Sequence, residues 1–289
     1  MADRRHSAWA AVLLLASTFA PTADARALSP RGEETCPLVM LAETGMALPG
    51  GGTLDVDFGL PPIIDDGREV SFTAGVDGDP RNQGLFVVGS EGLREILRGC
   101  GGTVGDGEGG NCGDPTPIGG TFSGLSNGNY QARGNSRGDI LFIADIANGS
   151  TERGLFLYRK ASETLTKIAA FGDPSPRGGI IEAISGRYAL DDEGRVAFLA
   201  FDENTDAFID GYLAEWRAGA VRILASDGDP IPGGGELDFV VTSVFFPDDG
   251  TAVPGGPLPS YGENGDFAYR GLSTAVRGIL LSKAGVWSW

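Results

Sequence analysis

The segment GDPSPRGG (residues 172–179) and the segment DDEGRVAF that follows it (residues 191–198) decide the fold, because both patterns recur along the chain. The pattern Gly-Asp-Pro-x-Pro occurs at 113–117, 172–176 and 228–232, and residues 45–49 form a weaker copy without Asp-Pro. A glycine pair follows each copy, at Gly50-Gly51, Gly119-Gly120, Gly178-Gly179 and Gly233-Gly234. Self-similarity at a nearly constant spacing indicates a repeat architecture.

A second landmark follows each first one. It is an Asn or Asp beside a Gly, and then a short alternating apolar run. Its copies are residues 65–72, 135–142, 191–198 and 263–269. Asn or Asp with Gly favours a turn with positive φ, so we expect a turn that leads into a half-buried strand. In the first copy the turn is expected at Asp65-Asp66-Gly67.

Each repeat then has two further strands, the first of which begins at a glycine (Gly84, Gly154, Gly211 or Gly278). In the third repeat the expected strands are 180–190, 195–201, 212–216 and 221–225. Four strands per unit predict an all-β, β-propeller-like fold of four repeats with about four antiparallel strands each. The expected units are approximately 38–112, 113–171, 172–227 and 228–289. An open stack and a β-sandwich-like arrangement are the alternatives.

The two ends of the repeat region predict ring closure. Leu38–Ala42 has the pattern of a lone strand, and the last unit ends in a partial strand at Val286–Trp289. We expect the N-terminal strand to join Gly278–Leu281 in one sheet, which would remove open sheet edges. The repeated Asp114, Asp173 and Asp229 are expected to cap turns by accepting backbone N–H bonds.

The N-terminus has the pattern of a signal peptide over residues 1–27. Arg4, Arg5 and His6 precede an apolar run from Trp9 to Ala16 that is too short to span a bilayer. Small residues then offer cleavage sites, so the mature protein is expected to begin near Ala27 or Leu28. The remaining domain, 28–289, is expected to be secreted, at the cell surface or extracellular.

Composition excludes several kinds of chemistry. The net charge of −17 disfavours binding to nucleic acid or to an anionic membrane, and no later segment is apolar enough for membrane insertion. The single histidine, His6, lies in the leader. The mature protein therefore has no Ser-His-Asp or Cys-His catalysis and no His-ligated metal site.

Three cysteines remain after export, which permits disulfides. Cys100 and Cys112 bracket a glycine-rich insertion, so a Cys100–Cys112 bridge is the favoured pairing. Cys36 is then unpaired or competes for one of the other two.

Acidic turns are the candidate metal sites. Asp202, Glu203, Asn204 and Asp206 lie close together between two expected strands, and oxygen ligands on a turn suit Ca²⁺. The run Asp106–Glu108 is a weaker candidate, and a solvated acidic loop is the alternative for both. Aromatic residues are candidates for a sugar-stacking face or for sheet packing; they are Trp216, Trp287, Trp289, Tyr130 and Tyr261.

The repeats resemble those of the bacterial choice-of-anchor family, which carry an Asn-x-x-Gly-x-x-(x)-Ala-Phe signature. Residues 135–142 match except for Leu141 at the alanine, and 191–198 match with Asp191 for asparagine. In the first copy Ile64 stands at the asparagine and Ser71 at the alanine; the last copy has Gly262 at the asparagine and Tyr269 at the phenylalanine. The resemblance implies export and surface display through varied C-terminal anchors, and it implies no catalytic residues. No anchor is recognised before Trp289, so a released protein or a shortened gene product is expected.

These observations predict a secreted or surface-displayed binding or scaffold protein with no identifiable catalytic activity and no cofactor beyond the possible Ca²⁺. The expected partner is an extracellular protein or a glycan. The alternative is an extracellular carboxylate-dependent hydrolase or lyase on the same scaffold. Acids that converge in a central pocket favour the enzyme, and a centre filled by side chains favours the binding module.

Overall fold

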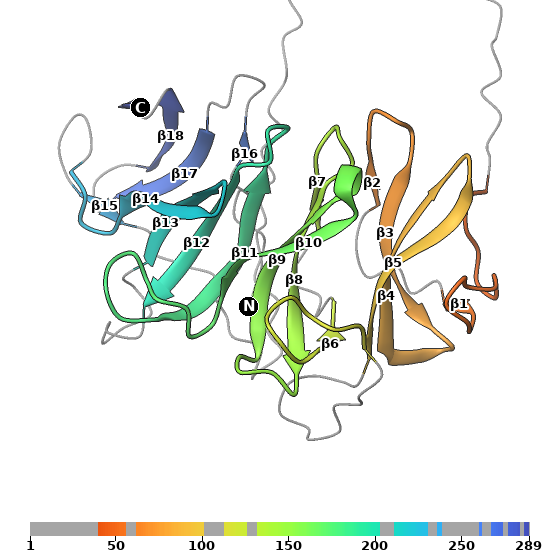
Figure 1. The fold of residues 1–289 in the computed structure, drawn as a ribbon. Helices are drawn as coiled ribbons and strands as arrows, with labels where there is room; N and C mark the ends of the chain where they lie inside the picture. Colours follow the sequence, from red (N-terminus) through yellow and green to blue (C-terminus); the bar gives the residue numbers. More distant parts are fainter. Residues whose placement is uncertain are drawn as a thin grey trace, which may run out of the picture. The chain divides into compact units, whose positions relative to one another are not determined.

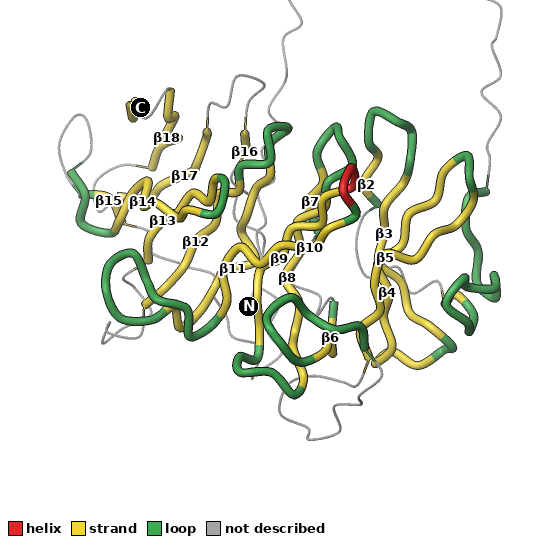
Figure 2. Tube along the Cα trace, in the orientation of Figure 1, coloured by secondary structure: helices red, strands yellow, loops and turns green. Residues whose placement is uncertain are grey.

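The computed structural model describes residues 40–55, 62–100, 113–125, 132–202, 211–230, 236–238, 260–261, 267–273, 277–283 and 286–288. These residues form an all-β protein with four antiparallel sheets (Figures 1 and 2). The one helical element among them is a short 3₁₀ turn, η1 (Lys160–Ser162). The described residues hold no helix with the length and apolarity needed to cross a membrane.

In each sheet the long strands follow chain order and are neighbours. The first sheet contains β1 (Leu54–Asp55), β2 (Ile63–Ile64), β3 (Val70–Val76), β4 (Asp79–Gly89) and β5 (Gly92–Cys100). The second contains β6 (Thr121–Gly124), β7 (Arg133–Gly134), β8 (Ile140–Ala147), β9 (Arg153–Arg159) and β10 (Thr164–Ala170). In both sheets two short strands pair with the same long strand, β3 or β8.

The third sheet contains β11 (Ile181–Leu190), β12 (Val196–Asp202), β13 (Gly211–Arg217) and β14 (Ala220–Ser226). The four strands expected in this repeat are therefore confirmed to within one or two residues. The fourth sheet contains β15 (Leu237–Asp238), β16 (Ser260–Tyr261), β17 (Phe267–Ser273), β18 (Arg277–Lys283) and β19 (Val286–Ser288). In the third sheet the first strand, β11, runs over ten residues, and it carries register shifts between Ile181 and Ala183 and between Ile184 and Tyr188.

The expected strand at Leu38–Ala42 is wrong for Met40–Ala42, the part that the structure describes. These residues form no strand, and Ala42 packs against the apolar cluster of the first sheet. Strand β18, which contains Gly278–Leu281, is paired on both sides, with β17 and with β19. The chain's last segment thus supplies the outer strand of the fourth sheet, and β18 has no open edge for another strand.

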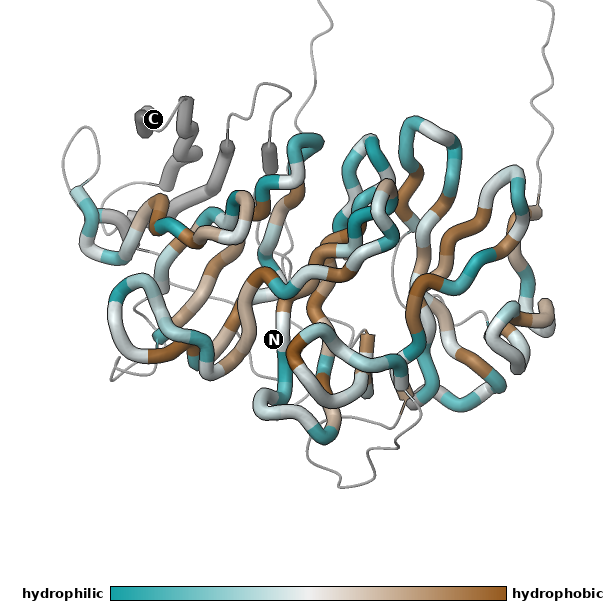
Figure 3. The backbone as a smooth tube through the Cα atoms, in the orientation of Figure 1, coloured by the Kyte–Doolittle hydropathy of each residue, from teal (hydrophilic) through white to brown (hydrophobic). Residues whose placement is uncertain are grey.

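Side chains of consecutive sheets share apolar clusters. One cluster joins β4 and β5 to β8 and β9, and another joins β8 and β9 to β12 and β13. As a result Ile140–Ile146 and Val196–Asp202 are buried on both faces. The expectation of half-buried strands is wrong for these two segments; the second sheet shares apolar clusters with both the first and the third. Figure 3 shows the apolar residues along the strands and hydrophilic ones at many of the turns.

The repeated aspartates cap the Gly-Asp-Pro turns, as expected. Asp173 Oδ2 accepts a hydrogen bond from the N–H of Ala170 at 2.8 Å, and Asp229 Oδ2 accepts one from Ser226 at 2.7 Å. Asp114 follows the cysteine-flanked insertion, and its Oδ2 accepts the N–H of Arg98 at 2.7 Å. In each of these three repeats the equivalent aspartate therefore joins the last strand of one sheet to the first turn of the next repeat.

We predict that Asp173→Ala lowers the free energy of unfolding by about 1–2 kcal/mol, since it removes a side-chain acceptor for a backbone donor. It also removes the 2.7 Å ion pair with Lys167, which is part-exposed and contributes less. Urea denaturation of the purified chain measures the change. Asp173→Asn keeps the acceptor and is the matched control, so an equal loss in both variants would contradict the capping role.

Candidate functional site

Three turns with one geometry form the candidate site, and we call them the turn row: residues 65–69, 135–139 and 191–195. In each, the first residue's side-chain oxygen accepts the backbone N–H of the fifth. The distances are 2.8 Å for Asp65 with Glu69, 2.9 Å for Asn135 with Asp139 and 2.6 Å for Asp191 with Arg195. Since an Asx side chain stabilises such a turn locally, each turn fixes where the strand that follows it begins. These strands are β3, β8 and β12.

The structure corrects the alignment of the first turn by one residue. Asp65, not Ile64, occupies the asparagine position, because its Oδ1 makes the same bond as Asn135 Oδ1. The residue with positive φ is then Arg68 at 62°, where Gly138 has 80°. The nearby Gly67 had suggested the wrong register, since glycine is the usual residue in this region.

Hydrogen bonds join turns of consecutive repeats. The N–H of Asp66 donates to the carbonyl of Ser136 at 3.0 Å, and the N–H of Ser136 donates to Asp192 Oδ1 at 2.9 Å. The Nδ2 of Asn135 donates to the carbonyl of Asp191 at 2.9 Å. The bond from Ser136 lowers the pKa of the Asp192 carboxyl. The three turns thus form one connected polar row.

Cations hold the buried carboxylates of the turn row. Lys160 Nζ lies 2.5 Å from Asp65 Oδ2, and Arg159 Nη1 lies 3.2 Å from Asp139 Oδ2. Arg159 also donates to the carbonyl of Gly194 in the next repeat, at 3.2 Å. In the third turn, Arg195 pairs with Asp191.

Burial and pairing act on these groups in opposite directions. Burial works to raise the pKa of Asp65, but hydrogen bonds from Lys160 and the Glu69 N–H outweigh it, and the pKa is lowered. For Asp191, burial prevails over the bonds from Arg195 and raises the pKa. Each buried carboxylate is nevertheless in contact with a cation. The arrangement therefore suits fixation of the turns better than proton transfer.

The predicted calcium ligands are only partly within the described residues. Asp202 ends β12, is 3% exposed and lies 3.9 Å from Arg177 Nε, while Glu203, Asn204 and Asp206 lie outside the described residues. No group of three or more His, Cys, Asp or Glu side chains suited to a metal occurs in the ranges described. The calcium site stays a prediction, but Asp202 is a buried group beside an arginine, not part of a solvated loop.

The neighbourhood of Asp202 is a polar cluster in the third sheet. Ser175 Oγ lies 3.2 Å from the Tyr212 hydroxyl, and the Arg177 guanidinium lies 5.9 Å from the centre of the Tyr212 ring. Burial raises the pKa of Tyr212 to about 12, and Asp202 adds to that shift. The phenol therefore stays protonated at neutral pH and serves as a hydrogen-bonding group.

Other predicted residues have simpler positions. Trp216 lies in the apolar cluster between the second and third sheets with 7% exposure, so it is a packing residue. Cys100 ends β5 and is buried, whereas Cys36 and Cys112 lie outside the described residues, so the Cys100–Cys112 pairing stays a prediction. The run Asp106–Glu108 and the remaining aromatic candidates are also outside them, or are described by backbone alone.

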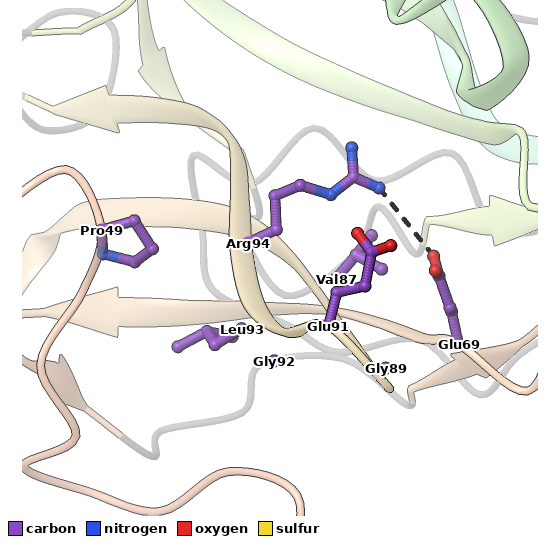
Figure 4. A pocket seen from close by; sticks show the side chains of 8 residues that line it. All are labelled: Pro49, Glu69, Val87, Gly89, Glu91, Gly92, Leu93 and Arg94. Carbon is purple, nitrogen blue, oxygen red and sulfur yellow. Dashed lines mark ion pairs between the residues drawn. The ribbon is translucent and has the colours of Figure 1, made fainter.

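A pocket that sequence reasoning missed lies beside the first turn (Figure 4). Glu69, Glu91 and Arg94 line it together with the apolar Pro49, Val87 and Leu93, and two glycines, Gly89 and Gly92, complete the wall. Its volume is about 200 Å³. Arg94 Nη2 lies 3.9 Å from Glu69 Oε2 across it. The sequence signal for this pocket is Gly89, which stands where the other repeats have an arginine or a lysine.

We predict a coupling energy of about 1–2 kcal/mol between Asp65 and Lys160 in a double-mutant cycle of Asp65→Asn and Lys160→Met at pH 7. The pKa of Asp65 is lowered in the fold, so its contribution is present above the unfolded value of about 3.9 and is lost as the pH falls through the folded value. The coupling measured by urea denaturation should therefore decrease as the pH is lowered below the unfolded pKa of Asp65 and through its folded pKa.

Lys167→Met combined with Asp65→Asn is the control for this cycle, because Lys167 pairs with Asp173 instead. These two changes should be additive. A coupling between Asp65 and Lys160 that is unchanged between neutral and acidic pH would contradict the ion pair as its source.

Comparison with known proteins places most of the chain in one family. A model described as a family of unknown function (DUF7453) matches residues 102–289, which include β6 to β19 and leave out the first sheet. No curated protein matches the chain. Because the matched region is more than half of the sequence, the chain belongs to the family of unknown function DUF7453.

Proposed function

We propose that this chain is an exported binding or scaffold protein whose four sheets are arranged as blades of a β-propeller-like fold. The observation that carries the proposal is the turn row, in which hydrogen bonds connect the turns of three consecutive repeats. Turns fixed in this way form a rigid polar platform. Rigid elements that present a constant surface suit binding, because little order is lost when a partner docks.

Contacts between first strands support the propeller-like arrangement. Strand β2 contacts β7, β7 contacts β11, and β11 contacts β16. In a propeller the first strand of each blade lies nearest the axis and beside its counterparts in the adjacent blades. The shared apolar clusters of consecutive sheets are also what blade stacking requires.

The chemistry of the turn row favours binding over the alternative hydrolase or lyase. Glycoside hydrolysis needs one carboxyl group that can donate a proton and a second that acts as base or nucleophile. Asp65, Asp139 and Asp191 are each held by a cation and by backbone N–H groups. A carboxylate in that setting is poorly placed to exchange protons with a substrate.

Export is supported by the leader pattern over residues 1–27 and by the resemblance to choice-of-anchor repeats, which implies display outside the cell. The partner we propose is therefore an extracellular protein or a glycan. The strong negative charge of the chain also suits an extracellular setting without nucleic acid.

We predict that the exported protein begins near Ala27 or Leu28, because the small residues before them form a cleavage site. N-terminal sequencing of protein recovered outside a secreting host provides the measurement. Replacing two apolar residues of the run from Trp9 to Ala16 by charged ones should retain the protein in the cell. Exported material with Met1 still present would contradict the leader.

The proposed function is tested by asking whether the mature chain retains or cleaves polysaccharides. We expect that incubation of the protein with neutral, acidic and amino-sugar polysaccharides yields no new reducing ends and no unsaturated products. If the partner is a glycan, one class of these polysaccharides should slow the protein in affinity electrophoresis. Release of product that is abolished by Asp191→Asn, with the fold intact by circular dichroism, would establish the enzyme instead. Glu182→Gln, an exposed change outside the turn row, is the matched control.

A further inference from the structure

One position near the end of β4, β9, β13 and β18, the strands that pair with β3, β8, β12 and β17, differs between the repeats. Cross-strand pairing makes Val88, Tyr158, Trp216 and Ser282 equivalent, since each faces the first residue of β3, β8, β12 or β17. The next residues are then Gly89, Arg159, Arg217 and Lys283. Three repeats carry a cation at this position, and the first carries no side chain at all.

The second repeat indicates what the cation does. Arg159 Nη1 lies 3.2 Å from Asp139 Oδ2, and Nη2 donates to the carbonyl of Gly194 at 3.2 Å. Asp139 is the fifth residue of its turn. The guanidinium thus neutralises a carboxylate of its own repeat and hydrogen-bonds the turn of the next one.

In the first repeat the equivalent carboxylate is Glu69, and Gly89 offers it no cation. Glu69 Cγ lies 2.7 Å from the position that a Cβ on Gly89 would occupy, so the glutamate lies over the space of the absent side chain. The pocket opens at this place, with Glu69 and Glu91 beside Gly89 (Figure 4). It is the counterpart of the volume that Arg159 fills in the second repeat.

The charges around the pocket do not balance. Arg94 Nη1 lies 2.7 Å from Glu163, and Lys160 Nζ lies 2.5 Å from Asp65 and 3.0 Å from Glu69. The lining of the pocket itself carries two carboxylates, Glu69 and Glu91, and one cation, Arg94. No cation of the described residues lies within ion-pair distance of Glu91, whereas Glu69 Oε2 lies 3.0 Å from Lys160 Nζ and 3.9 Å from Arg94 Nη2.

We propose that this pocket binds a guanidinium or alkylammonium group, which takes the place that the chain's own arginine occupies in the second repeat. Glu69 and Glu91 would pair with the cation, and a planar guanidinium matches carboxylates best. Pro49, Val87 and Leu93 supply apolar surface for the methylene stem behind the charge. The volume of about 200 Å³ suits the end of such a side chain and is small for a larger ligand. This site goes beyond the proposed scaffold role and does not depend on it.

In the test, the purified mature chain is titrated with capped arginine, and binding is measured by calorimetry or by the change in NMR chemical shifts. Capped citrulline, which has nearly the same shape without the charge, is the matched control ligand. We expect a Kd of about 1 mM for arginine and at least about tenfold weaker binding for citrulline. Raising the salt from about 20 mM to about 200 mM should weaken the arginine complex, because part-exposed charges are screened. Equal binding of the two ligands, or no binding of arginine, would overturn the proposal.

Two further ligands distinguish the natural source of the cation. A Gly-Arg-Gly peptide represents a basic side chain of a protein partner, and spermidine represents a free polyamine. Tighter binding of the peptide assigns the site to a protein partner, and tighter binding of spermidine assigns it to a small amine.

Variants locate the binding in this pocket. Glu91→Gln removes one charge from an exposed turn and should weaken arginine binding about tenfold, whereas Glu182→Gln makes the same change in the third sheet and should leave it unaltered. Gly89→Arg restores the internal cation and should abolish binding. Since that side chain must displace Glu69, the Glu91→Gln result decides the outcome if Gly89→Arg fails to fold. Unchanged affinity in Glu91→Gln would refute the site.

Discussion

One hydrogen bond, from a backbone N–H to an Asx side chain four residues earlier, sets the geometry on which the rest depends. In the Asn135 turn it fixes where β8 begins, and with it which residues of the strand face either neighbouring sheet. A shift by one residue would exchange those two faces completely. Because β8 and β12 are buried on both faces, such a shift would bury the wrong side chains in two interfaces at once.

This constraint also explains why the turns carry charge. A turn at the end of a doubly covered strand lies close to the turn of the next sheet, so its polar groups need partners there. Asn135 and Ser136 find them in the backbone and carboxylate of the third turn, and Arg159 joins Asp139 to Gly194. The acidic character of the landmark thus fits the packing of consecutive sheets.

The sequence predicted the strands of the third repeat and the capping by Asp173 because both follow from local rules of turn and strand formation. It did not predict the first turn's register, since Gly67 drew attention away from Asp65 and a positive φ at Arg68 is uncommon for a residue with a Cβ. Burial on both faces of β8 could not be foreseen either, because it depends on neighbours distant in sequence. The candidate pocket was missed for a related reason: Gly89 is informative only after cross-strand pairing has shown which residues are its counterparts.

The polar contacts between consecutive repeats differ from one pair of repeats to the next, and this difference bears on folding. Repeats with similar strands can pair with the wrong neighbour during folding, a common failure of tandem arrays. Here Lys160 reaches back from the second repeat to Asp65, whereas Arg159 reaches forward to Gly194. A segment placed out of order would leave these part-buried cations without the partners that they have here. The polar contacts therefore differ from one pair of consecutive sheets to the next, whereas the clusters between the sheets are apolar throughout.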